Sequence, residues 1–167
     1  YADEIYQMQI PTIDTGISEE SYTSGLSTIK RVSTSYAGVI EKDTTLSANT
    51  VMYGDVCIKG SLDLNGYDLT VTGSLNHTYG NLTLNGGTLN VGKDYIGAKV
   101  VTNAEGKKEY LFNGNRSGDW HGLYMKNAND KMTVGGNFIE CENGEMSKGV
   151  LRVGGNVESY NGFDYGA

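Results

Sequence analysis

The chain of 167 residues has one proline, which restricts the backbone, and two cysteines, which could cross-link it. It contains one tryptophan. It also lacks any run of about 18 apolar residues, the length that a membrane-spanning helix needs, so we expect no insertion into a membrane. Its 13 Lys and Arg are outnumbered by 20 Asp and Glu, which gives a net charge of −7. Because nucleic-acid binding needs clustered basic side chains, the charge argues against a nucleic-acid partner.

The two cysteines, Cys57 and Cys141, lie far apart in the sequence. No Cys-x-x-Cys pair or Cys/His cluster accompanies them, so they do not predict a zinc site. The repeat described next places them several turns apart, whereas a disulfide needs Cα atoms within about 7 Å. We therefore expect two separate thiols.

Glycine is abundant, with 24 residues, and it punctuates an internal repeat. Residues 60–75 read GSLDLNGYDLTVTGSL, and residues 80–95 read GNLTLNGGTLNVGKDY, so matching positions are 20 residues apart. A fixed period of this size indicates a solenoid, in which each coil buries its apolar side only by stacking on its neighbours. The repeat predicts an all-β protein, a single-stack β-solenoid with about 20 residues per coil, and we expect a right-handed β-helix.

Each coil divides into short segments in which apolar residues alternate with polar ones, the pattern of strands with one buried face. Asn-Gly and Gly-Gly pairs between them supply the positive φ that sharp corners need. We count about five coils, the last incomplete. The predicted inward rows are Leu62/Leu82/Leu123, Leu64/Leu84/Met125, Leu69/Leu89/Met132/Leu151 and Val71/Val91/Val134/Val153.

The sequence indicates two parts and one insertion. Residues 1–36 are polar, without a clear period, and are expected to form an extended N-terminal arm or linker. Residues 37–167 are expected to form the solenoid. Within it, residues 98–120 break the period, and two apolar stretches flank Asn103–Lys108, which predicts a β-hairpin on one side of the stack.

Residues that could carry catalysis are not grouped. A β-helical polysaccharide-active enzyme would need carboxylates clustered on one outer face, and the outward positions do not repeat them. Acidic residues such as Asp55, Asp94 and Asp130 are scattered, so we expect solvated corner carboxylates and no metal site. We predict no catalytic residue, no cofactor and no enzyme, with a polysaccharide-active enzyme as a distant third alternative.

One stretch after the insertion could bind a ligand. Arg116, Asp119, Trp120 and His121 combine an aromatic ring with charged and polar groups, as proteins often do to hold sugars or peptides. The alternative is that Trp120 packs the hairpin against the solenoid. His77 is expected to be an ordinary corner residue.

The segment from about residue 58 to 160 resembles a glycine-punctuated repeat module of large secreted or surface proteins of Gram-positive bacteria, some with adhesin or polymorphic-toxin architectures. The resemblance rests on Gly60–Gly66, Leu69–Leu75, Leu89–Tyr95, Leu123–Phe138 and Gly149–Asn156. It implies a secreted, β-helical, non-catalytic module at the bacterial cell surface, and it supplies no catalytic residues.

Two functions follow as expectations. The first is a structural module, either the subunit of a surface filament or the rigid stalk of a surface protein. In this case it would associate with itself through coil ends or the N-terminal arm, or with neighbouring domains of a larger chain. The alternative is an adhesin that binds a glycan or a protein.

Overall fold

Every regular element that the structure describes is a β-strand. The structure, a computed structural model, describes residues 20–21, 30–31, 38–112 and 121–160. The strands are, in chain order, β1 (Glu20–Ser21), β2 (Lys30–Arg31), β3 (Gly38–Ile40), β4 (Thr44–Thr45), β5 (Thr50–Met52), β6 (Val56–Ile58), β7 (Leu62–Asp63), β8 (Asp68–Val71), β9 (Leu75–His77), β10 (Asn81–Thr83), β11 (Thr88–Val91), β12 (Tyr95–Gly97), β13 (Lys99–Thr102), β14 (Lys108–Leu111), β15 (Gly122–Met125), β16 (Lys131–Val134), β17 (Phe138–Glu140), β18 (Glu145–Met146), β19 (Val150–Val153) and β20 (Val157–Ser159). No helix in these residues is long and apolar enough to cross a membrane.

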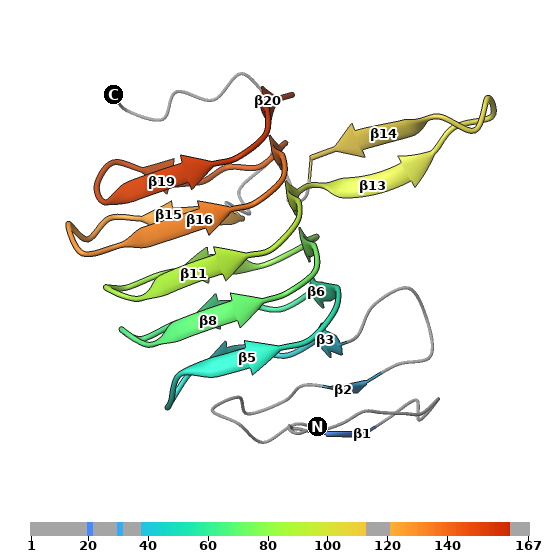
Figure 1. Ribbon diagram of the computed structural model, residues 1–167. Coiled ribbons are helices and arrows are strands. Elements are labelled where there is room, and N and C mark those ends of the chain that lie inside the picture. The colour runs from blue at the N-terminus through green and yellow to red at the C-terminus, as the bar shows by residue number, and fades with distance from the viewer. Residues whose placement is uncertain (1–19, 22–29, 32–37, 113–120, 161–167) are drawn as a thin grey trace.

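The strands stack into three sheets that form the walls of a β-solenoid (Figure 1). We call β1-β2-β3-β6-β9-β12-β17-β20 the first sheet, β4-β7-β10-β15-β18 the second and β5-β8-β11-β16-β19 the third. From β3 onward each turn adds one strand to each sheet, in parallel. The described residues therefore make five complete turns, and β20 begins a sixth. The predicted all-β solenoid is confirmed.

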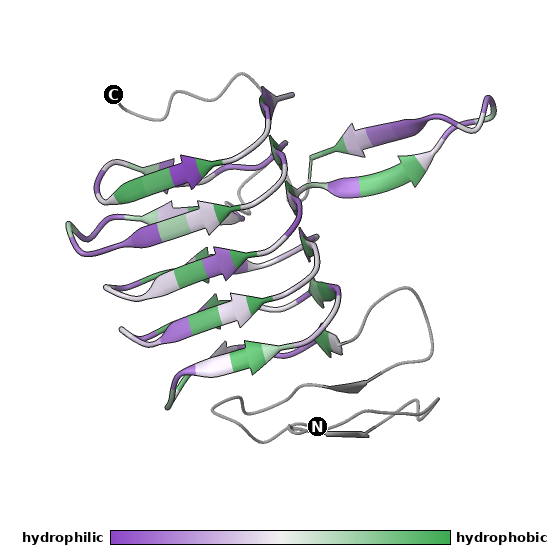
Figure 2. Ribbon diagram, in the orientation of Figure 1, coloured by the Kyte–Doolittle hydropathy of each residue, from purple (hydrophilic) through white to green (hydrophobic). Residues whose placement is uncertain are grey.

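The predicted inward rows lie in register across the turns. Leu62 and Leu82, which are 20 residues apart, are partners, and Leu82 also pairs with Leu123. Strand segments alternate between apolar and polar residues (Figure 2), and the apolar ones form one continuous core. Aliphatic side chains from neighbouring turns thus remove each other from water, which is the main stabilising term of such a stack. The rows through β8, β11, β16 and β19 are Leu69/Leu89/Met132/Leu151 and Val71/Val91/Val134/Val153.

Two equivalent corners show why the repeat contains Asn-Gly. Asn65 and Asn85 have φ values of 51° and 50°, and the following Gly66 and Gly86 have 82° and 89°. Asparagine tolerates this left-handed conformation better than most residues, and glycine adopts it without a steric penalty. The pair therefore turns the chain sharply between the second and third sheets.

Polar side chains at one corner bind the backbone of the next turn, so the half-exposed carboxylates of Asp55 and Asp94 also have a structural role that the sequence did not predict. Asp55 Oδ1 accepts a hydrogen bond from the N–H of Ser74 at 2.8 Å, and Ser74 Oγ accepts one from the N–H of Asp94 at 3.2 Å. Asp94 Oδ1 and Asn137 Oδ1 accept from Asn137 and Asn156 in the same way. This ladder pairs backbone donors that the strands leave unpaired.

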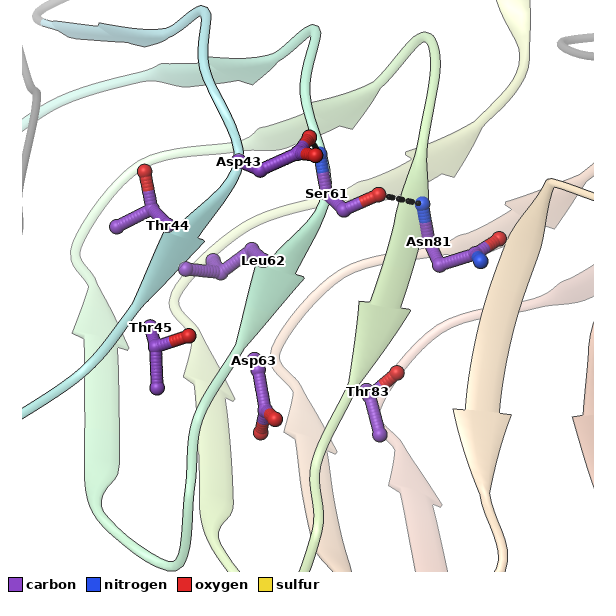
Figure 3. Close-up of a pocket in the computed structure, with 8 residues that line it drawn as sticks. All are labelled: Asp43, Thr44, Thr45, Ser61, Leu62, Asp63, Asn81 and Thr83. Carbon is purple, nitrogen blue, oxygen red and sulfur yellow. Dashed lines mark hydrogen bonds between the residues drawn. The ribbon is translucent and has the colours of Figure 1, made fainter.

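A second ladder of this kind joins the first three turns at the start of the second sheet. Asp43 Oδ1 accepts a hydrogen bond from Ser61 N at 3.0 Å, and Ser61 Oγ accepts one from Asn81 N at 3.1 Å (Figure 3). Asp130, also expected to be solvated, is buried, and it accepts hydrogen bonds from the N–H groups of Gly86 and Asn127. Polar corner residues therefore help to fix the stacking of the turns.

The period is interrupted by an antiparallel hairpin. Strands β13 and β14 pair from Lys99↔Leu111 to Thr102↔Lys108, as the sequence predicts for this segment. The hairpin projects from the side of the stack (Figure 1). Tyr110 on β14 contacts Tyr160 beyond β20, with ring centroids 5.2 Å apart. One residue of the hairpin therefore contacts the end of the stack.

Four strands of the first sheet are buried on both sides, which simple alternation does not predict. Val39, Cys57, Asn76 and Ile139 occupy outward positions of β3, β6, β9 and β17, yet each is buried. Cys57 and Cys141 form no disulfide, as expected. The exposed outer faces of the solenoid therefore belong to the second and third sheets.

Candidate functional site

The predicted ligand-binding flank is only partly within the described residues. Arg116, Asp119 and Trp120 lie outside them, and ligand binding by this flank stays a prediction. His121 immediately precedes β15 and is half-buried. Its ring packs against that of Tyr79, with centroids 4.0 Å apart and planes at 38°. His121 is thus placed by an aromatic contact with the preceding turn.

A polar cluster lies inside the solenoid close to this point. His77 ends β9 at the inward position that Ile40 and Ile58 occupy in the two preceding turns. It is completely buried, so the expectation of an ordinary corner residue is wrong. Two buried glutamates, Glu140 at the end of β17 and Glu142 just beyond it, complete the set with Tyr95 of β12.

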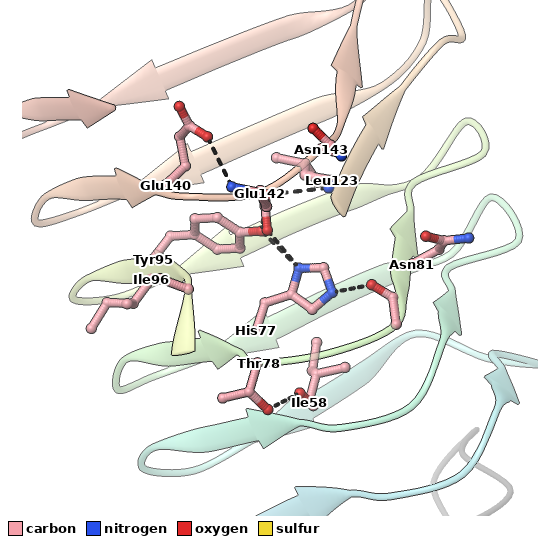
Figure 4. Close-up of polar contacts among 12 residues, drawn as sticks. Ile58, His77, Thr78, Asn81, Tyr95, Ile96, Leu123, Glu140, Glu142 and Asn143 are labelled. Carbon is pink, nitrogen blue, oxygen red and sulfur yellow. Dashed lines mark hydrogen bonds and ion pairs between the residues drawn. The ribbon is translucent and has the colours of Figure 1, made fainter. Parts of the chain in front are cut away.

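Glu142 is the centre of this cluster (Figure 4). Its Oε1 accepts hydrogen bonds from the hydroxyl of Tyr95 at 2.9 Å and from the N–H of Leu123 at 3.2 Å. Its Oε2 lies 3.1 Å from Nδ1 of His77. The two side chains are 0% and 2% exposed, so their interaction is shielded from water.

The hydrogen-bond distances indicate where the hydrogens of His77 Nε2 and of the Tyr95 hydroxyl lie. Nε2 of His77 is 2.7 Å from the carbonyl oxygen of Gly80, which can only accept, so Nε2 carries a hydrogen. The hydroxyl hydrogen of Tyr95 is directed to Oε1 of Glu142. Nδ1 of His77 lies 3.1 Å from Oε2 of Glu142 and 3.0 Å from the hydroxyl oxygen of Tyr95, so the ring contacts both partners.

A glycine makes room for Glu142. Gly97 follows His77 by one turn in the inward row, and a Cβ atom built on it would overlap the carboxylate of Glu142. This is also where the chain leaves the coil for the hairpin, and Leu123 lies where it has returned. Glu142 thus joins both ends of the insertion to the preceding turn.

Glu140 is the least satisfied member of the cluster. Its Oε2 accepts a long hydrogen bond of 3.4 Å from the N–H of Glu142, whereas its Oε1 is buried and has no hydrogen-bond partner among the described residues. Within the described part of the chain, no three His, Cys, Asp or Glu residues are arranged so that they could hold a metal ion. The arrangement therefore supports the fold around the insertion, where two interrupted backbone segments meet.

Sequence inspection missed this cluster although it contained a signal. His77 stands 19 residues after Ile58, close to the period of the repeat, and so occupies a position that is apolar in the preceding turns. A polar residue in an apolar row needs a buried partner. The partner itself, Glu142, could not be found this way because it follows the insertion.

No protein-family model, curated protein or solved structure matches this chain. The class of protein is therefore defined by the fold alone, a parallel β-solenoid with a hairpin insertion.

Proposed function

We propose that this chain is a non-catalytic structural module of the bacterial cell surface, and specifically the subunit of a filament that grows by end-to-end stacking of solenoids. The resemblance to repeat modules of surface proteins supports the location. The unequal ends of the described stack support the assembly.

The N-terminal end of the core is closed. Ile40, Leu46 and Met52 point inward from the first turn, and they are 0%, 1% and 4% exposed. At this end of the first sheet β2 pairs antiparallel with β3, and β1 pairs antiparallel with β2 (Figure 1). The apolar rows therefore do not end in solvent here.

The C-terminal end of the core is open. Val157 takes the inward position that Phe138 holds one turn earlier, yet it is 64% exposed. Met146, Leu151 and Val153 end the other inward rows and are only partly buried. A hollow of ≈ 310 Å³ opens beside Met146 and Leu151. Strands β18, β19 and β20 have no neighbour on their outer edges among the described strands, so backbone groups and apolar surface are presented together.

The two ends of the first sheet have compatible directions. Because β1 is antiparallel to β2 and β2 is antiparallel to β3, β1 runs in the same direction as β3 and β20. Strand β1 of one subunit can thus extend the first sheet of another by pairing in parallel with β20. Such a head-to-tail contact joins different surfaces, and it produces a filament when successive subunits stack along one axis instead of closing a ring.

The exposed inward side chain of Val157 carries this proposal, and substitution by lysine tests it. We expect the unmodified chain to form filaments in electron micrographs as its concentration rises, and Val157→Lys to stay monomeric with an unchanged circular dichroism spectrum. Val51→Lys is the matched control, because Val51 is 50% exposed but points outward from β5. Single particles of the unmodified chain at every concentration would refute assembly and favour a stalk or an adhesin.

A further inference from the structure

We propose that the outer face of the second sheet binds a neutral glycan, along a groove that crosses the first three turns. The groove has a volume of ≈ 290 Å³ and lies over β4, β7 and β10 (Figure 3). Binding here uses a lateral face, so it is independent of end-to-end stacking. The groove is lined by Asp43, Thr44, Thr45, Ser61, Leu62, Asp63, Asn81 and Thr83.

Polar side chains line the groove in two rows that follow the stacking of the strands. Thr45, Asp63 and Thr83 are register partners in one row. The other row lies at the start of the same strands (Figure 3). It consists of Asp43 just before β4, Ser61 just before β7 and Asn81 at the start of β10. Successive members of each row are separated by the spacing of adjacent strands, about 4.8 Å. The groove therefore offers polar groups at regular steps, which suits a ligand built from repeated hydroxylated units.

Several of these groups make no hydrogen bond to the residues that the structure describes. Within the described residues the hydroxyls of Thr45 and Thr83 and Nδ2 of Asn81 make no hydrogen bond, whereas Oδ1 of Asn81 is buried and so is closed to a ligand. Asp43 uses only Oδ1, for the N–H of Ser61, which leaves Oδ2 as an acceptor. Hydroxyl, amide and carboxylate groups together can donate to and accept from sugar hydroxyls.

The row continues into an aromatic residue. Tyr124 of β15 is the register partner of Thr83 in the next turn, and its ring is half-buried. Its hydroxyl donates to the carbonyl oxygen of Asn143 at 3.3 Å, which holds the ring in place. A fixed aromatic ring beside hydrogen-bonding groups is a common combination for binding an amphipathic ligand such as a sugar ring.

Charge selects the kind of glycan. Asp43 and Asp63 line the groove, and no Lys or Arg does. An anionic polysaccharide would bring like charges together in the groove, which is unfavourable. A neutral glycan meets no such penalty, and the carboxylates accept its hydroxyl hydrogens.

Amide chemical shifts of the full chain, measured during titration, test this site. The probes are cellohexaose and chitohexaose as neutral glycans and hexagalacturonate as the anionic one. We expect at least one neutral probe to shift the amide signals of Thr45, Asp63 and Thr83, and hexagalacturonate to bind more weakly. If neither neutral hexasaccharide shifts these signals at millimolar concentration, or if the anionic one binds at least as tightly, the proposal is wrong.

Two variants separate groove binding from general surface contact. Thr83→Val removes a hydroxyl from the groove and keeps the side-chain shape, so we expect about three- to tenfold weaker binding of the neutral probe. Thr133→Val makes the same change at an exposed position of β16 on the third sheet and is expected to leave the affinity unchanged. If both variants lose the same affinity for the neutral probe, the glycan does not bind in this groove.

Discussion

Replacement of Glu142 by alanine should destabilise the solenoid strongly. The carboxylate accepts hydrogen bonds from Tyr95 and Leu123 and contacts His77, and all of these atoms are buried. Losing the partner of a buried polar group costs about 1–3 kcal/mol, and breaking a buried ion pair from one side costs about 3–5 kcal/mol. We therefore expect Glu142→Ala to lower the free energy of unfolding by about 3–5 kcal/mol, a large part of the stability of a typical domain.

Glutamine at position 142 is the control that separates hydrogen bonding from the charge of the carboxylate. It keeps an oxygen to accept from Tyr95 and Leu123, and its amide N–H can donate to Nδ1 of a neutral His77. We expect Glu142→Gln to lose less than about 1 kcal/mol, because every hydrogen bond is replaced.

Urea unfolding followed by far-ultraviolet circular dichroism measures both variants under the same conditions. Because glutamine keeps the volume and the acceptor oxygen of glutamate and alanine keeps neither, we expect a clear gap between Glu142→Ala and Glu142→Gln. Equal losses for the two variants would contradict the reasoning, because the charge of the carboxylate, which both variants remove, would then set the stability instead of its hydrogen bonds.

Three further changes test other parts of the structure. Gly97→Ala places a methyl group where the carboxylate of Glu142 lies, so urea unfolding should show a loss approaching that of Glu142→Ala, and unchanged stability would mean that the carboxylate can move aside. Leu82→Ala leaves a cavity in a fully buried row and should cost about 2–5 kcal/mol in the same assay; a smaller loss would show that neighbouring turns collapse around it. The hydrogen bond from Ser147 and then Lys126 lower the pKa of Glu145, so this group stabilises the fold above its unfolded pKa and the contribution is lost as the pH falls through its folded pKa. Ser147→Ala should raise the pKa of Glu145 in an NMR titration, and no change would assign the shift to Lys126 alone.

The sequence by itself determined the solenoid, because its information is local and repeated. A period of 20 residues aligns Leu62 with Leu82, and alternation within each coil sends these side chains to the same side. The Asn-Gly corners were predictable for the same reason, since positive φ at these positions depends on neighbouring atoms only.

Only the tertiary structure decided which polar residues are buried and which end of the core is open. Glu142 reaches Tyr95 across 47 positions, and the hairpin between them shifts the chain out of the repeat, so no fixed period links the two. Val157 has the inward position of an apolar row, yet its exposure depends on whether another strand covers β20. Burial is a property of the assembled neighbours, whereas the repeat specifies only which side of a strand each residue faces.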